Sequence, residues 1–299
     1  MKTFSESERM CQMAFDSCGN VWHGYTSGKE MPMLFVNDED LIFAINVIAY
    51  AAFVHKGVVR ILTFEVMNNH FHFVLCGNEN DIQEFFRFIV RKLKRTIPCA
   101  GNLKLELKPI ADLQSLRNNI VYNNRNGYVA DPGHTPFSYP WGAGRYYFNS
   151  FPITSTFKEI SYLENRRMFR GANVDIPDDW QVIDGYIAPP SFCDVRLGMA
   201  MFRDAHHYFA MVTKNVEAYS GIAVELDDGE FLTDQELYSQ LLQKVRDQYR
   251  VASFRDLSKA QRLDLARTLH YDYRSSNGQI RRVLGLTQYE VDSLFPMGK

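Results

Sequence analysis

Apolar and polar residues alternate in several short stretches of the first 150 residues, and helical spacing fills the intervals between them. Alternation with a period of two predicts strands, and apolar residues three to four positions apart predict helices. The predicted strands cover 21–26, 33–36, 58–67, 70–77 and 103–107, and the predicted helices cover 39–54, 81–97 and 112–127. Their order is typical of a ferredoxin-like antiparallel sheet with helices on one face. The predicted fold class is therefore α+β.

Residues that favour turns and helix ends separate these elements. Asn37 and Asp112 are suited to cap the helices that follow them, and Asn68-Asn69 suits the turn of a hairpin. Gly127 suits the position just after a helix end. These signals place the element boundaries that the periodicity leaves open.

The second half of the chain has a different pattern. Prolines and acidic residues predominate in 151–232, which we interpret as a connecting region with some helix, notably at about 198–220. Three capping boxes predict helices that begin near 234, 259 and 288. The boxes pair Thr233 with Glu236, Ser258 with Gln261, and Thr287 with Glu290. The predicted organisation is a first domain over 1–150, the connecting region, and a helical domain over 233–299.

Composition narrows the class of protein. Of 299 residues, 46% are hydrophobic and 14% aromatic, which excludes a wholly disordered chain. The net charge of −2 argues against a uniformly basic nucleic-acid binder. The five cysteines form no C-x-x-C pair, which argues against a disulfide scaffold or a cysteine zinc site. No apolar run is long enough to span a bilayer and no signal peptide is apparent, so we expect a cytoplasmic protein without membrane contact.

Two histidines are the most informative residues. On a strand, His70 and His72 point to the same side, with Cα atoms roughly 6.5–7 Å apart. Two imidazoles at that spacing are able to ligate one divalent metal ion. The phenylalanines between and beyond them face the opposite side, into a core. His23 is interpreted as a lone structural histidine.

The residues around these histidines carry a family resemblance. The run Met67-Asn68-Asn69-His70-Phe71-His72 resembles the motif of the single-tyrosine HUH transposases, and most closely that of the REP-associated tyrosine transposases. Asn68 replaces the usual proline of that motif. Further similarity covers 33–40, 113–117, 127–132 and 139–141, so the resemblance extends over roughly the first half of the chain.

The resemblance implies a transposase that cuts single-stranded or hairpin DNA. Family members use a tyrosine that forms a 5′-phosphotyrosine link, assisted by a divalent metal ion, Mg²⁺ or Mn²⁺. In this chain His70 and His72 would hold that ion. The family includes both dimers and monomers, so a homodimer is one of two assemblies that the resemblance allows.

The tyrosine position departs from the family pattern. In ungapped register Asn118 stands where the family has its tyrosine, and Tyr122 stands four residues later. Residues four apart share a helix face, so Tyr122 is the candidate nucleophile, and Asn126 or Asn118 the candidate third metal ligand. The alternatives are a catalytically inactive, domesticated relative that binds DNA, and a metal hydrolase with acidic ligands that the sequence does not identify.

Two segments have the composition of DNA-contacting surfaces. Residues 86–108 contain seven basic side chains and one acidic one, on an amphipathic helix and the strand after it. Near the other end, 265–295 resembles a helix-turn-helix module. The predicted DNA contacts are Arg87, Arg91, Lys92, Lys94, Arg95, Lys104, Arg281, Arg282, Gln288 and Tyr289. We expect DNA to lie along 87–108, near His70 and His72.

Overall fold

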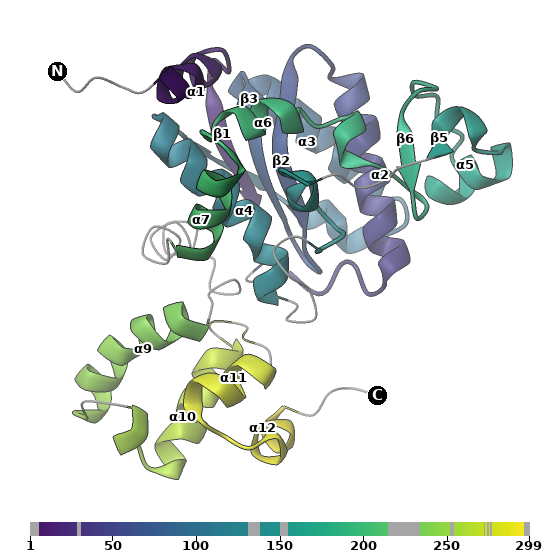
Figure 1. The fold of residues 1–299 in the computed structure, drawn as a ribbon. Helices are drawn as coiled ribbons and strands as arrows, with labels where there is room; N and C mark the ends of the chain where they lie inside the picture. Colours follow the sequence, from purple (N-terminus) through teal and green to yellow (C-terminus); the bar gives the residue numbers. More distant parts are fainter. Residues whose placement is uncertain are drawn as a thin grey trace. The chain divides into compact units, whose positions relative to one another are not determined.

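The computed structural model describes residues 6–28, 31–130, 138–149, 155–214, 234–251, 254–271, 273, 275 and 277–295. The chain divides into two compact units, Met1–Lys214 and Asn215–Lys299. Figure 1 traces both along the sequence. The described part of the predicted connecting region, 155–214, belongs to the first unit, and residues 215–232 lie outside the described part.

Unit 1 is an α+β structure built on a four-stranded antiparallel sheet. Its strands are β1 (Val21–Thr26), β2 (Val59–Val66), β3 (Phe71–Gly77) and β4 (Leu105–Pro109), in the spatial order β2-β3-β1-β4. Helix α2 (Asp38–Val54) connects β1 to β2, α3 (Glu79–Leu93) connects β3 to β4, and α4 (Leu113–Ala130) follows β4. The strand predicted at 33–36 is wrong. The backbone there instead donates from Leu34 and Phe35 to the carbonyl of Asn68, at 2.8 Å in both cases.

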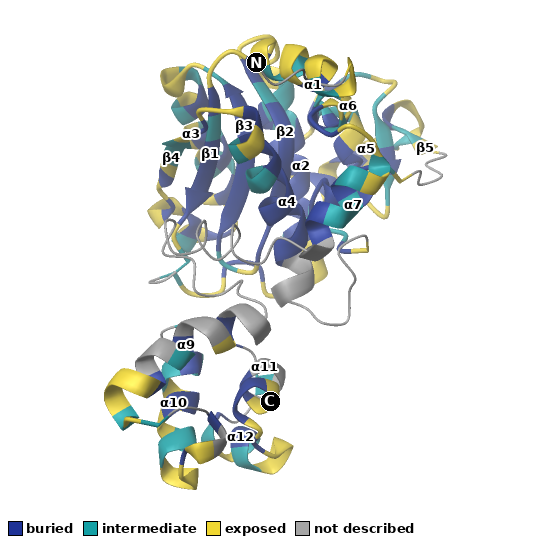
Figure 2. Cartoon of the chain, turned by 60° about the vertical axis from the view of Figure 1, so that its left-hand side comes forward, coloured by how far each residue is buried: buried dark blue, intermediate teal, exposed yellow. Residues whose placement is uncertain are grey.

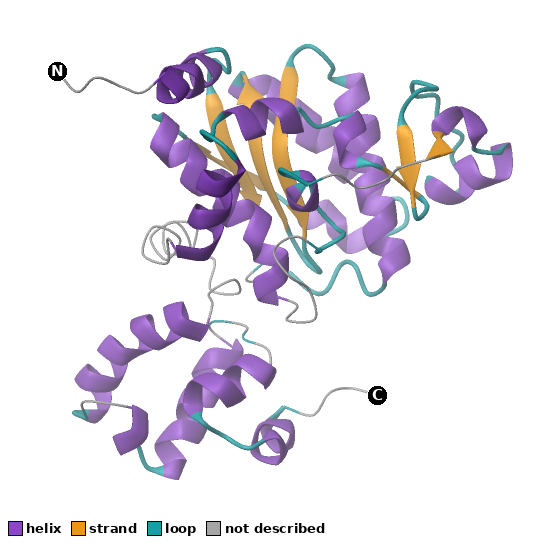
Figure 3. Ribbon diagram, viewed as in Figure 1, coloured by secondary structure: helices purple, strands orange, loops and turns teal. Residues whose placement is uncertain are grey.

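Helices cover both faces of this sheet, so the expectation of helices on one face is also wrong (Figure 3). On one face Phe71 and Phe73 pack against Phe86 and Phe85 of α3. On the other face α4 packs against β2 and β3. Strands β1, β2 and β3 are buried along most of their length (Figure 2), because both faces of the sheet lie beneath helices, whereas β4 is largely exposed or half-buried.

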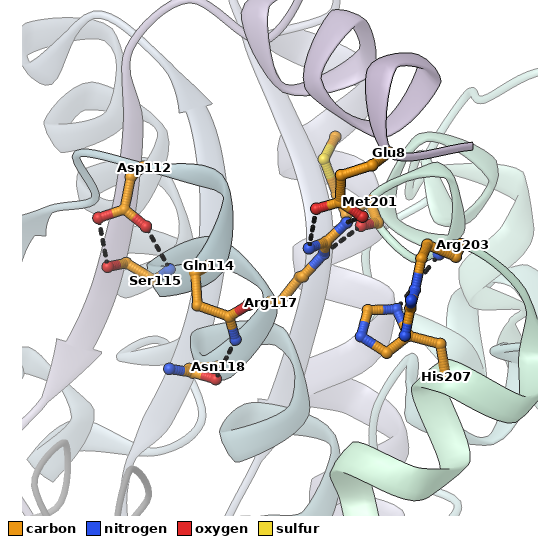
Figure 4. A network of polar contacts seen from close by, with 9 residues as sticks. All are labelled: Glu8, Asp112, Gln114, Ser115, Arg117, Asn118, Met201, Arg203 and His207. Carbon is orange, nitrogen blue, oxygen red and sulfur yellow. Dashed lines mark hydrogen bonds and ion pairs between the residues drawn. The ribbon is translucent and has the colours of Figure 1, made fainter. Parts of the chain in front are cut away.

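The predicted starts of α2 and α4 are confirmed, whereas the helix predicted over 81–97 begins earlier, at Glu79, and ends at Leu93. The side chain of Asn37 accepts from the backbone N–H of Asp40 at 3.0 Å and begins α2. Asp112 accepts from the backbone N–H of Ser115 at 2.7 Å and begins α4 (Figure 4). The expected helix end at Gly127 is wrong, because α4 continues to Ala130.

A small second sheet and several short helices complete unit 1. The sheet contains β5 (Ser155–Thr156), β6 (Gln181–Ile183) and β7 (Tyr186–Ile187), and the helices are α1 (Glu6–Asp16), α5 (Tyr162–Met168), α6 (Val195–Ala200) and α7 (Ala205–Lys214). Short 3-10 segments occupy Pro98–Asn102, Gly144–Tyr146, Phe157–Glu159 and Pro189–Ser191. The buried Asn46 of α2 joins the small sheet and α5 to the helices of the main sheet. Its side-chain Nδ2 donates to the carbonyls of Met168 and Gly185, and its Oδ1 accepts from the backbone N–H of Ile187.

Unit 2 is helical in its described part. It contains α9 (Asp234–Tyr249), a 3-10 turn (Phe254–Asp256), α10 (Lys259–Tyr271), α11 (Asn277–Leu284) and α12 (Gln288–Leu294). The predicted capping box of Thr287 and Glu290 is present at the start of α12. The hydrogen bond from Lys259 and those from Thr287 lower the pKa of Glu290 to about 2. No helix in the described ranges is both long and apolar enough to cross a membrane.

One buried arginine attaches α4 to the helices beside it (Figure 4). The Arg117 side chain is 4% exposed; its guanidinium donates to both carboxylate oxygens of Glu8 on α1, at 2.7 and 3.2 Å. Its Nε also donates to the Met201 carbonyl at 2.6 Å. The bond from Arg117 holds the pKa of Glu8 below its ordinary value. Three segments distant in sequence therefore meet at one guanidinium group.

We expect Glu8→Gln to destabilise the protein by about 1–3 kcal/mol, because it removes a charged acceptor from a nearly buried arginine. Denaturant unfolding at neutral pH measures the loss. Glu8 stabilises the fold above its unfolded pKa and loses that effect as pH falls, so the deficit of the variant shrinks in acid. Glu6→Gln, at an exposed position on the same helix, is the matched control. Equal stability of the two variants would contradict the anchoring role of Arg117.

Candidate functional site

The two motif histidines lie side by side on the sheet face that α4 covers. His72 is in β3, and His70 is the last residue of the turn before it. Their ring centroids are 5.1 Å apart and both side chains are at most 2% exposed. Two imidazoles that share one metal ion have centroids about 5 Å apart, given metal–nitrogen bonds near 2.1 Å and tetrahedral angles. The spacing between the rings therefore suits a shared ion.

A chain of hydrogen bonds fixes the tautomer of His72. Asn119 on α4 donates through Nδ2 to the Ser115 carbonyl at 2.8 Å, so its Oδ1 accepts from His23 Nδ1 at 2.6 Å. His23 Nε2 is then an acceptor and receives the proton of His72 Nδ1 at 3.2 Å. In the neutral ring the remaining lone pair of His72 is at Nε2, which is the form that binds a metal ion.

The side-chain amide of Asn69 fixes the tautomer of His70. Asn69 donates through Nδ2 to the Gly28 carbonyl at 3.2 Å, and its Oδ1 accepts from His70 Nδ1 at 2.6 Å. The lone pair of the neutral ring is again at Nε2. This packing requires glycine at position 28, since a Cβ there would lie 2.9 Å from His70 Nδ1.

Tyr122 lies against the histidines, on the predicted face of α4. Its ring centroid is 5.9 Å from that of His72 and 6.0 Å from that of His23, and the side chain is 2% exposed. The sequence-predicted tyrosine and histidines are thus brought together, beneath a helix.

The polar residues of α4 that accompany Tyr122 recur at helical spacing. Asn119, Tyr122, Asn123 and Asn126 occupy positions i, i+3, i+4 and i+7, which form one stripe. We call this stripe, together with His23, His70 and His72, the polar seam. Asn123 and Asn126 are 0% exposed, and within the described part neither side-chain amide has a hydrogen-bond partner. Buried amides without partners are rare in native proteins, so these two make the stripe a candidate functional site.

The two predicted third ligands differ in their surroundings. Asn126 is 0% exposed and lies one turn beyond Tyr122 on α4. Asn118 is half-buried, and its Oδ1 accepts from Gln114 on its own helix at 3.1 Å (Figure 4). Asn118 and Asn126 thus differ in burial and in hydrogen bonding, and the choice between them as a third ligand stays a prediction.

Sequence analysis missed three residues of this site: His23, Asn119 and Glu65. His23 is not an isolated structural histidine, because it bonds to His72. Glu65, 2% exposed, lies directly opposite His72 across the β2–β3 hairpin. The hairpin signal was sufficient to find it, since a turn over 67–70 pairs 66 with 71 and 65 with 72. No group of three His, Cys, Asp or Glu side chains arranged to hold an ion occurs among the described residues.

The predicted DNA contacts do not surround the histidines. Helix α3 packs on the opposite face of the sheet, so the expectation that its basic side chains lie near His70 and His72 is wrong. Arg87, Arg91, Lys94, Arg95 and Lys104 are exposed and Lys92 is half-buried. In unit 2, Arg281, Arg282 and Gln288 are exposed, and Tyr289 is 83% exposed. Gln288 donates to Asp292 at 2.9 Å.

Comparison of the chain with protein-family models, with curated proteins and with solved structures finds no significant match. The interpretation of the site therefore depends on its residues and their geometry.

The hydrogen-bond chains predict that His70 and His72 both carry their proton on Nδ1 at neutral pH. Long-range ¹⁵N–¹H correlation spectra of the imidazole rings measure this directly. Asn119→Ala removes the acceptor at the end of the first chain, so we expect the tautomer of His72 to become mixed while that of His70 stays fixed. A wild-type His72 protonated on Nε2 would contradict the proposed chain.

Proposed function

We propose that the polar seam is the active site of a transposase-like HUH endonuclease, which cuts and rejoins single-stranded or hairpin DNA through Tyr122. The observation that carries the proposal is the contact of the Tyr122 ring with His72, whose ring centroid lies 5.1 Å from that of His70. A phenol, two neutral imidazoles and a buried amide without a partner are the groups that metal-assisted tyrosine chemistry needs.

The connectivity of unit 1 supports the proposal. The strand order β2-β3-β1-β4, with α2 and α3 as the connections, is the arrangement expected of a ferredoxin-like sheet. His72 lies in a central strand of this sheet, and α4, which bears Tyr122, follows the last strand. The chemistry and the topology therefore agree with the family that the sequence resembles.

The residues of the seam have distinct roles in the proposed reaction. A bound Mg²⁺ or Mn²⁺ supplies positive charge that stabilises the phosphate oxygens in the transition state. His70 and His72 would hold it through Nε2, and Asn126 would be the third ligand. The Tyr122 oxygen attacks the scissile phosphorus and forms the 5′-phosphotyrosine link while the bond from phosphorus to the 3′ oxygen breaks. The phenol proton goes to that leaving oxygen, which departs as a 3′-hydroxyl, and the reverse attack rejoins the strand. Asn69, Asn119 and His23 act as positioning residues, because they fix the ring tautomers.

One observation favours a second candidate, a catalytically inactive relative that binds DNA. Tyr122, His70 and His72 are all at most 2% exposed, so DNA reaches them only if α4 moves. Arg117 and its bonds to Glu8 and Met201 oppose that movement. In this candidate function the exposed helices of unit 2 bind the DNA, and the polar seam has no catalytic activity.

The C-terminal helices supply a DNA surface under either candidate. Helices α11 and α12, joined by a short turn at Gly285, have the order of a helix-turn-helix module. Gln288 and Tyr289 at the start of α12 are placed to meet base edges, and Arg281 and Arg282 to meet phosphates. The acids of α12 are partly neutralised, since Glu290 pairs with Lys259 at 2.6 Å.

Tyr122→Phe separates the two candidates. We expect the wild-type chain, incubated with Mn²⁺ and a hairpin oligonucleotide labelled on the 3′ side of the cut, to form a labelled covalent adduct that survives denaturing electrophoresis. Tyr122→Phe abolishes the adduct because it lacks the nucleophilic oxygen. Tyr147→Phe is the control, since Tyr147 is equally buried and its hydroxyl bonds to the Leu62 carbonyl instead.

Three results contradict the proposal. An adduct of equal yield in Tyr122→Phe assigns the nucleophile to another residue. A wild-type chain that binds the hairpin but never forms an adduct supports the inactive DNA binder. Hydrolysis of the oligonucleotide without an adduct identifies a metal hydrolase of another kind.

A further inference from the structure

A pocket of about 340 Å³ lies among α2, the end of α3 and the segment that follows α5. Its walls include Phe43 and Tyr50 from α2, Lys92 and Arg95 from the α3 end, and Phe169 from the third segment. Because α2 and α3 lie on the Phe71 face of the sheet, the sheet separates this pocket from the polar seam. The pocket is therefore a second, independent site in unit 1.

The pocket has an excess of positive charge. Within the described ranges no acidic side chain forms an ion pair with Lys92 or Arg95. The acid Asp40 forms its ion pair with Arg170. The Arg170 guanidinium lies 4.7 Å from the ring centroid of Phe43, a residue of the pocket wall. Desolvation, with the charges of Arg95 and Arg91, lowers the pKa of Lys92. An anion in the pocket would supply the missing counter-charge.

The same pocket is lined by aromatic rings. Tyr50 and Phe169 pack edge to face with centroids 6.2 Å apart. The ammonium of Lys92 lies 4.9 Å from the Tyr50 ring centroid, at the boundary between the aromatic and cationic walls. A pocket with aromatic walls and adjacent cations suits a ligand that has a planar ring at one end and a strong anion at the other.

We propose that this pocket binds one nucleotide unit, with its phosphate on Lys92 and Arg95 and its base against Tyr50 and Phe169. Its volume lies at the low end of the range of small-ligand sites, which suits a mononucleotide rather than a dinucleotide. The unit is either a free nucleotide or one nucleotide of a single-stranded DNA, since both present the same phosphate and base. The proposal does not depend on nuclease activity at the polar seam.

Calorimetric titration of the full chain at low ionic strength tests the proposal. The probes are deoxyadenosine monophosphate, deoxyadenosine and inorganic phosphate. We expect one monophosphate to bind per chain, at least about tenfold more tightly than either fragment, because only the whole nucleotide engages both walls. Binding no tighter than that of inorganic phosphate would overturn the nucleotide assignment.

Variants test which residues are responsible. Lys92→Gln and Arg95→Gln each weaken binding of the monophosphate by about tenfold, as expected for one charge-assisted contact. Tyr50→Leu weakens binding of the monophosphate but leaves the affinity for inorganic phosphate unchanged. Lys94→Gln is the matched control, because Lys94 is an exposed cation at the same helix end that does not line the pocket. Thermal melting verifies that each variant is folded, and a folded Lys92→Gln with wild-type affinity contradicts the proposal.

Competition distinguishes the two sources of the nucleotide. A deoxyadenosine hexanucleotide that binds more tightly than the monophosphate, and is displaced by it, identifies single-stranded DNA as the source. A hexanucleotide that binds more weakly identifies a free nucleotide. Equal losses of monophosphate affinity in Lys92→Gln and Lys94→Gln would show only a general attraction of anions to the helix. That result would overturn the assignment of the binding site to this pocket.

Discussion

The structure of unit 1 depends on how α4 packs a polar stripe against a polar sheet face. Apolar stripes usually occupy the buried side of a helix, because their burial stabilises the fold. Here Asn119 and Tyr122 contact the histidines instead, and Asn123 and Asn126 lie at helical spacing on the same stripe. Each buried amide without a partner costs roughly 1–3 kcal/mol. Sites that carry such a cost in natural proteins are commonly functional.

The surroundings compensate for this cost. The apolar residues Leu116, Ile120 and Val121 of α4 are 0% exposed, so this part of the helix surface packs in an apolar core. Arg117 attaches the helix to Glu8 and to the Met201 carbonyl. The position of Tyr122 relative to the histidines is thus determined by contacts outside the seam. The same contacts control access, because any substrate as large as DNA requires α4 to shift.

The sequence predicted the parts of this arrangement that follow from local rules. Period-two alternation located the four strands of the main sheet, and the spacing of His70 and His72 predicted that they share a face. Local sequence patterns could not predict the hydrogen bond between His23 and His72, because the pairing of β1 with β3 joins residues about 50 positions apart. The isolated polar residue Asn46 within an apolar helix was a signal for the small second sheet, but its partners are more than 120 residues away.

The central claim is that the polar seam binds a divalent metal ion through His70, His72 and Asn126. Electron paramagnetic resonance titration of the full chain with Mn²⁺ tests it most directly. The account predicts one bound ion per chain, with affinity reduced at least about tenfold in His70→Gln and in Asn126→Ala. His206→Gln, at an exposed position on α7, keeps wild-type affinity. Mn²⁺ affinity that is the same in wild type, His70→Gln and Asn126→Ala would contradict the account.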